Sequence, residues 1–394
     1  MRMLHGWTTP GTLRDKMNES TLNEDRLTDT YLPNDRYGAV EALIMKEAPA
    51  FAGPFLEPQD IEEFLPLRLI GAPIDGCIRN LTHDFPDGPT YWVLIRTAVP
   101  NAMIAKFGTF QCVVIGMALP LAVVGLATNL LRWEPLRRYL LEGVSPPAEQ
   151  APVRVTRSEA VQRLIDRAAA WDDETGALAS TLNFMTLYLL TAHELGHLAL
   201  GHLDRTGVRG GFIEESPAAG TDLIEARESR ALEWDADIFA AAATIWWTGV
   251  PGVREDWKDV LTDKPAGLRL FFVGAYVFFS VMDRVSKSST PDPLRTHPAP
   301  MVRITLMIMG AAQVLQALGG FTADEAQNEA RAAIRAVEIA LNELEGGMMD
   351  RTEAAALQEA LDISVEECTT TLASLIPGLS RHRLSGLFWA GSLG

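Results

Sequence analysis

The chain is poor in cysteine and in basic side chains. It has 394 residues, of which 3 are cysteines, and 34 lysine and arginine residues stand against 51 acidic ones, a formal net charge of −17 at pH 7. Three cysteines far apart in the sequence give no disulfide framework and are typical of a reducing compartment. The acidic balance argues against a nucleic-acid partner, which needs clustered Lys and Arg, and against docking on anionic lipid. We therefore expect a cytoplasmic protein.

We also expect no secretory signal, because the first residues contain no apolar stretch of sufficient length. Residues 1–36 are polar and are expected to form an N-terminal arm. The rest has globular composition, with 47% hydrophobic and 22% charged residues, which rules out disorder throughout. We assign a main domain to residues 37–320 and a helical C-terminal extension to residues 321–394.

One long stretch lacks charge altogether. The 25 residues between Lys106 and Arg132 are enough to span a bilayer. However, Gly108 separates two β-rich runs, residues 102–107 and 110–119, which are typical of a hairpin. A helix at residues 121–131 would follow, with Pro120 in its first turn. We favour the hairpin and helix, and membrane association remains the alternative.

Helical patterns dominate the remainder, so the predicted fold class is α+β, mainly helical with a small β-sheet. The apolar run at residues 270–282 is too short for a span and predicts a buried core helix. Residues 37–100 mix short apolar segments with Pro and Gly and give no assignment. Other helices are expected at residues 157–171, 181–202, 223–247, 322–345, 351–361 and 365–375, with a linker at 142–152 and loops at 204–220 and 286–300.

The most informative segment is His193-Glu194-Leu-Gly-His197, inside the helix expected at 181–202. Two histidines four residues apart share one helix face and can bind one Zn²⁺ together. Glu194 can reach a water on the open side of such a metal and act as general base. The pattern is typical of a zinc hydrolase, and the alternative is a polar helix face that matches by chance.

A third ligand is available in Glu233-Trp-Asp-Ala-Asp237, on the helix expected at 223–247. Glu233 would complete a set of two His and one Glu. Asp237 lies one turn further along and would accept the free N–H of a ligand His. Asp235 is two positions from Glu233, so we expect it to point elsewhere as a solvated charge. The alternative reading makes all three acids an exposed helix face.

His202 follows the motif by five residues. It is turned about 140° around the helix from His197 and cannot join the same ligand face. Gly201 is expected to end the helix, so that His202 caps or packs there.

The two motifs together resemble the gluzincin metallopeptidases, in particular the family of the HtpX heat-shock protease and the CAAX prenyl protease, and the Lit-like phage-exclusion peptidases. The resemblance covers roughly residues 100–304 and implies a zincin-like metallopeptidase fold for the main domain assigned to residues 37–320. It identifies His193, His197 and Glu233 as zinc ligands, Glu194 as the base, and Asp237 as the acceptor behind a ligand His. Peptidases that cleave phage repressors share the longer His-Glu-x-Gly-His-x-x-x-Gly-His run but usually have Asn at the position of Asp237. Heat-shock and prenyl proteases usually carry several transmembrane helices, which favours a soluble relative here.

Two further segments are similar to the same family. Thr296-His297-Pro298 and the following Arg303-Ile304 resemble its His-Pro…Arg-Ile segment. The resemblance implies that His297 or Arg303 faces the cleft and stabilises the oxyanion or binds the substrate backbone. A loop His and a surface Arg are the alternative. Residues 100–105, Pro-Asn-Ala-Met-Ile-Ala, resemble the Asn-Ala strand that precedes the metal helix in these peptidases. An exposed strand there could pair with an extended substrate.

The sequence therefore predicts a zinc-dependent endopeptidase that binds Zn²⁺ and acts on a protein or peptide substrate. A non-catalytic interaction protein stabilised by zinc, and a membrane-anchored quality-control peptidase, are the alternatives. The substrate and the oligomeric state are left open.

Overall fold

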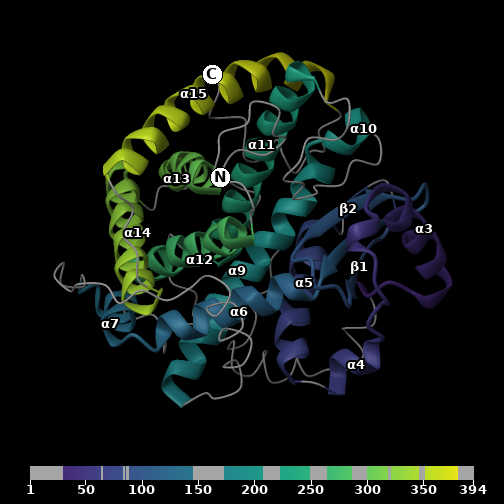
Figure 1. Ribbon diagram of the computed structural model, residues 1–394, viewed down its shortest axis with the longest axis horizontal. Coiled ribbons are helices and arrows are strands. Elements are labelled where there is room, and N and C mark those ends of the chain that lie inside the picture. The colour runs from purple at the N-terminus through teal and green to yellow at the C-terminus, as the bar shows by residue number, and fades with distance from the viewer. Residues whose placement is uncertain are drawn as a thin grey trace, which may run out of the picture.

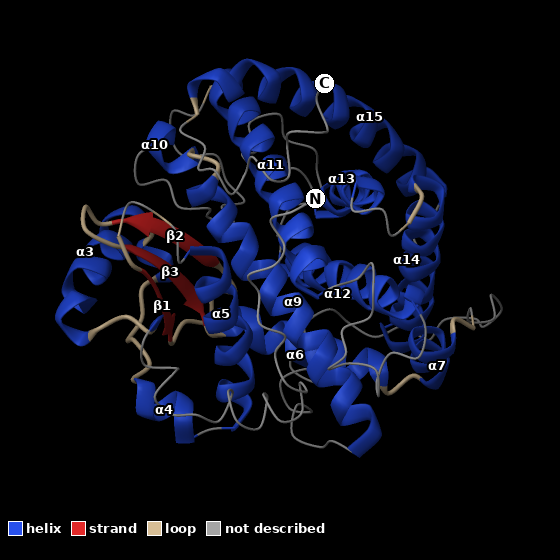
Figure 2. Cartoon of the chain, turned by 180° about the vertical axis from the view of Figure 1, so that it is seen from behind, coloured by secondary structure: helices blue, strands red, loops and turns tan. Residues whose placement is uncertain are grey.

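The computed structural model describes residues 30–63, 65–82, 85, 88–144, 173–206, 222–248, 264–285, 300–317, 321–345 and 351–379. These residues are mainly helical with one small sheet, which confirms the coarse fold class (Figures 1 and 2). Most of the predicted arm, most of the linker, the helix at 157–171 and the loop containing His297 lie outside the described residues.

The sheet has three strands in the order β1-β3-β2, namely β1 (Thr90–Ile95), β2 (Ala102–Lys106) and β3 (Gln111–Gly116). β2 and β3 pair antiparallel, with Lys106 opposite Gln111, and β1 runs parallel to β3. Gly108 has a φ of 71° in the connecting turn, a conformation that favours glycine. The predicted hairpin is confirmed. The expectation of an exposed strand is wrong, because the side chains of residues 102–105 are buried and β2 packs against α9 (Asp173–Ala199).

The uncharged stretch after Lys106 is divided between the hairpin and α6 (Ala118–Leu131). Among the described helices, one is long and apolar enough to cross a membrane, α12 (Lys264–Val285). Of its 18-residue apolar window, 94% is buried inside the protein. The prediction of a buried core helix is confirmed, although α12 extends beyond both ends of the expected segment.

Helices also fill most of the unassigned segment before β1. Pro58 begins one of them and Pro73 lies inside another, and prolines of this kind hide a helical pattern. The elements are η1 (Asn34–Arg36), α3 (Tyr37–Glu47), η2 (Pro49–Phe51), α4 (Pro58–Glu63) and α5 (Leu65–Thr82), and α7 (Glu134–Glu142) follows α6.

Helix α9 lies at the centre of the fold and packs against α5, α6, α11 (Leu223–Thr248) and α12 (Figure 1). It begins at Asp173, earlier than expected, and ends at Ala199. Gly201, with a φ of 78°, separates it from the short α10 (His202–Thr206), as the sequence predicts. Helix α11 is covered in turn by α9, α13 (Pro300–Ala317) and α15 (Arg351–Leu375).

The C-terminal helices curve around α12 and α13 (Figure 1). α14 (Ala323–Glu345) packs on α12 and α13, and α15, followed by η4 (Ile376–Gly378), packs on α11 and α13. Arg230 of α11 forms an ion pair of 2.5 Å with Glu367 of α15. The prediction of two helices at 351–361 and 365–375 is wrong, because residues 362–364 contain neither Gly nor Pro to interrupt one continuous helix.

A glycine lets the two helices of the predicted metal site approach closely. A Cβ at Gly196 of α9 would lie 3.2 Å from Cα and 3.3 Å from the carbonyl oxygen of Ala236 in α11. These neighbours are helix backbone, which cannot rotate away as a side chain does. Gly310 of α13 faces the side chain of Ile238 in α11, and a Cβ there would lie 2.7 Å from Cγ1. The two glycines therefore allow α9 and α13 to approach α11 closely.

We expect Gly196→Ala to lower the free energy of unfolding relative to Gly76→Ala. Both substitutions gain about 1 kcal/mol of helix propensity, but an added Cβ at Gly76 of α5 meets nothing within 4 Å. Overpacking at Gly196 should cost roughly 1–3 kcal/mol, so the two variants should differ by that amount. Urea unfolding of both variants measures the difference. Equal stabilities would show that the α9–α11 crossing tolerates a methyl group.

Candidate metal centre

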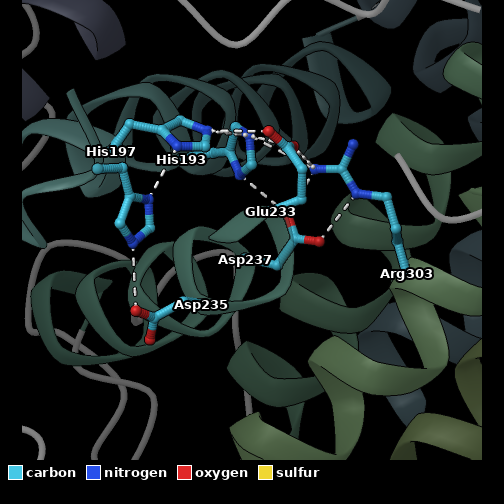
Figure 3. Close-up of polar contacts among 7 residues, drawn as sticks. His193, His197, Glu233, Asp235, Asp237 and Arg303 are labelled. Carbon is cyan, nitrogen blue, oxygen red and sulfur yellow. Dashed lines mark hydrogen bonds and ion pairs between the residues drawn. The ribbon is translucent and has the colours of Figure 1, made fainter. Parts of the chain in front are cut away.

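Three potential ligand atoms converge between α9 and α11 (Figure 3). Nε2 of His193 lies 3.3 Å from Nε2 of His197 and 3.3 Å from Oε2 of Glu233. Nε2 of His197 lies 3.3 Å from Oε1 of the same carboxylate. All three side chains are buried. The structure thus brings together the three residues that the sequence predicts as ligands.

This group fits a small divalent cation. In a tetrahedral zinc site with bonds of about 2.0–2.1 Å, two ligand atoms lie about 3.3–3.4 Å apart. The 3.3 Å between the two Nε2 atoms matches that edge length, and each Nε2 lies at the same distance from one of the two oxygens of Glu233. The set of two imidazoles and one carboxylate suits Zn²⁺ and also other first-row divalent ions.

Behind His193 lies Asp237, with Oδ1 2.9 Å from Nδ1 of the imidazole. Because an ionised carboxylate only accepts, Nδ1 carries the proton in the neutral ring and the lone pair of Nε2 faces the ligand group. Burial raises the pKa of Asp237, but the charge of Arg303 and the contact with His193 outweigh it and hold this pKa below its ordinary value. Asp237 therefore lies where the sequence predicts it.

Arg303 of α13 reaches the same group from a third helix (Figure 3). It donates to both carboxylate oxygens of Asp237, over 2.9 Å from Nε and 2.8 Å from Nη2. Its Nη2 also lies 3.2 Å from Oε2 of Glu233. The alternative of a surface Arg is wrong, since Arg303 is buried. The observed contacts hold two carboxylates in place, and the family's cleft-facing role stays a prediction. His297 lies outside the described residues.

Glu194 belongs to the same buried cluster. Burial lowers the pKa of Arg303, but the negative charges of Asp237, Glu233 and Glu194 outweigh it and raise this pKa above its ordinary value. With Asp235, four carboxyl groups are buried here. Arg303 is a single positive charge, so a divalent cation would offset much of the remaining negative charge.

The expectation of a solvated Asp235 is wrong. Its side chain is fully buried, and Oδ2 lies 3.2 Å from Nε2 of His202. His202 is outside the ligand group, as predicted, yet its Nδ1 lies 3.0 Å from Nδ1 of His197. Both faces of α11 are covered by other helices, so pointing away from Glu233 does not mean pointing to solvent. Residues 238–243 are all apolar and extend around every side of α11, and they are the sequence signal that indicates this burial.

Metal-free protein is expected to lose stability as the pH rises from about 7 to 10. Burial lowers the pKa of the His193 imidazole, but hydrogen bonds to Asp237 and Glu233 and their charges outweigh it and raise the pKa from 6.5 to about 10. Because the folded protein binds this proton more tightly than the unfolded chain, the protonated His193 stabilises the folded state fully below pH 6.5. This stabilisation is lost as the pH rises to the pKa of about 10 in the folded protein. Urea unfolding with chelator present measures the slope. In His193→Gln the free energy of unfolding should fall less steeply over this pH range. Equal slopes in the two proteins would contradict a protonated His193.

Comparisons of the chain with protein-family models, with curated proteins and with solved structures give no match. What this centre does must therefore be inferred from its own residues.

Proposed function

We propose that the protein is a zinc-dependent endopeptidase with its active site at His193, His197 and Glu233. The observation that carries the proposal is that Nε2 of His193 and Nε2 of His197 lie 3.3 Å apart, and that each lies 3.3 Å from one oxygen of the Glu233 carboxylate. It matches a tetrahedral zinc site with three protein ligands, the arrangement that leaves a fourth position for water or substrate. The motif resemblance to gluzincin peptidases supports the choice of a peptide bond as the target.

A bound Zn²⁺ supplies Lewis acidity, which lowers the pKa of water and polarises the scissile carbonyl. Glu194 takes the proton of the attacking water as general base and delivers it to the leaving amine. Its position directly after His193 on α9 puts its carboxylate in the buried cluster. Such a carboxylate beside the ligands suits a base, whereas a purely structural metal site needs none.

The remaining residues of the cluster hold the ligands. Asp237 fixes the His193 ring with its Nε2 lone pair toward the metal position. Arg303 neutralises part of the negative charge and connects Asp237 to Glu233. Pairing with two hydrogen bonds to one carboxylate restrains both side chains. These residues are positioning groups in the proposed mechanism.

A second candidate function is that of a non-catalytic interaction protein in which the metal is structural. The observation that favours it is burial, because His193, His197 and Glu233 are each only 5% exposed. Both candidates require bound zinc, and they differ in whether Glu194 contributes to hydrolysis.

The first test is metal content. We expect one zinc per chain in protein purified without added metal, measured by inductively coupled plasma mass spectrometry. A double variant, His193→Ala with His197→Ala, should lose it, because two of the three ligands are gone. Zinc retained at one equivalent in that variant would place the metal elsewhere.

The second test is Glu194→Gln. This variant should keep zinc and fold, because Glu194 is not a ligand, while hydrolysis falls by roughly 10²–10⁴-fold with loss of the general base. Cleavage of casein, and cleaved termini in a cell lysate treated with each protein, provide the measurement. Near-native turnover in the variant would rule out this mechanism. If the zinc-loaded wild-type protein cleaves no substrate that Glu194→Gln leaves intact, the result favours the candidate function in which the metal is structural.

A further inference from the structure

A second chain of contacts runs behind the other ligand histidine. Nδ1 of His197 lies 3.0 Å from Nδ1 of His202, and Nε2 of His202 lies 3.2 Å from Oδ2 of Asp235. The two rings are packed edge to face, with centroids 5.1 Å apart. His202 is 1% exposed and Asp235 is fully buried. His202 therefore contacts His197 on one side and Asp235 on the other, and both contacts are shielded from water, in surroundings where hydrogen bonds are strongest.

The chemistry of these atoms fixes the direction of each hydrogen bond between neutral rings. The carboxylate of Asp235 can only accept, so Nε2 of His202 donates to it. Nδ1 of neutral His202 then has a lone pair and accepts from Nδ1 of His197. The remaining nitrogen of His197, Nε2, is left with its lone pair directed at His193 and Glu233. One carboxylate thus sets the tautomer of a histidine that it does not touch.

We propose that Asp235 and His202 form a relay that orients His197 and fixes its Nε2 as a metal ligand. This inference rests on the proposed metal site. It makes Asp235 the counterpart of Asp237, since each of these two carboxylates of α11 supports one ligand histidine of α9. Asp237 does so directly over 2.9 Å, and Asp235 does so through His202. Both acids are positioning residues.

The backbone explains how His202 reaches this place. α9 ends at Ala199, and Gly201 has a φ of 78°, in the left-handed region that glycine adopts at helix ends. The chain changes direction there, and α10 begins at His202. Its imidazole can therefore lie against His197, although the two residues would point about 140° apart on one continuous helix.

The relay predicts a loss of zinc affinity when either member is replaced by an apolar side chain of similar size. Asp235→Leu and His202→Phe should each bind Zn²⁺ about 10–100-fold more weakly, as removal of a group behind a ligand typically does. Asp235→Asn keeps an oxygen that accepts from His202 and should lose less. Competition with a chromogenic chelator measures the affinity of the full-length protein. The absorption spectrum of the Co²⁺-loaded protein reports the ligand field and should change in the two apolar variants.

Two controls separate the relay from a structural effect. Asp204→Asn removes one carboxylate from α10, two residues after His202, where Asp204 pairs with Lys106 in an exposed contact of 2.6 Å. It should bind zinc as wild type does. The double variant of Asp235→Leu with His202→Phe should lose no more affinity than either single one, because both changes break the same path.

The outcomes are distinct. Wild-type affinity and an unchanged Co²⁺ spectrum in Asp235→Leu and His202→Phe, or additive losses in the double variant, would overturn the relay alone. A wild-type protein that binds no zinc would overturn the proposed function together with the relay. If Asp235→Leu does not fold, His202→Phe and His202→Gln carry the same comparison. Wild-type affinity in both would then overturn the relay.

Discussion

The central physical constraint of this structure is that four carboxyl groups are buried close together on α9 and α11, with one guanidinium, that of Arg303, among them. Glu194, Glu233, Asp235 and Asp237 are each at most 5% exposed, and unpaired charge in such a place costs several kcal/mol per group. Every polar contact of the cluster offsets part of this cost. Arg303 joins two of the acids, and the histidines contact three of them. The cluster is stable only with its members together, and a divalent cation would complete it.

This constraint explains why the surrounding helices pack so closely. Gly196 of α9 and Gly310 of α13 have no side chain of their own where they face α11, which favours close approach of the helices that carry the charged groups. Short, dry contacts strengthen electrostatic attraction because less water screens it. Close packing of the helices and strong polar contacts in the cluster are therefore linked.

Local patterns in the sequence predict much of this arrangement. The i, i+4 spacing of His193 and His197 places them on one face whatever surrounds the helix. The same reasoning relates Glu233 to Asp237, and Gly108 between two β-rich runs predicts the hairpin. Such inferences succeed because they depend on a few neighbouring residues. They fail where prolines obscure a helical pattern, as in α5. They also fail where a helix end is assumed without a Gly or Pro to mark it, as within α15.

Inferences about solvent exposure are harder, and Asp235 shows why. Helical phase predicts that Asp235 and Glu233 point in different directions, which the structure bears out. It does not predict what lies in each direction, because that depends on how α13 and α15 pack against α11 and on where α10 places His202. Arg303 is a related case, since its partners Asp237 and His193 are 66 and 110 residues away in the sequence. No local periodicity links these positions.

That separation along the chain also has a consequence for synthesis. The ribosome makes His193, His197 and Glu233 well before α13, so a growing chain carries the ligand residues while Arg303 is still missing. Contacts between distant segments form late, because a long loop must close first. In the interval the acids Glu233 and Asp237 lack the guanidinium that restrains them in the finished protein. The centre is thus assembled only after most of the chain has been made, and an incomplete chain lacks the geometry on which its chemistry depends.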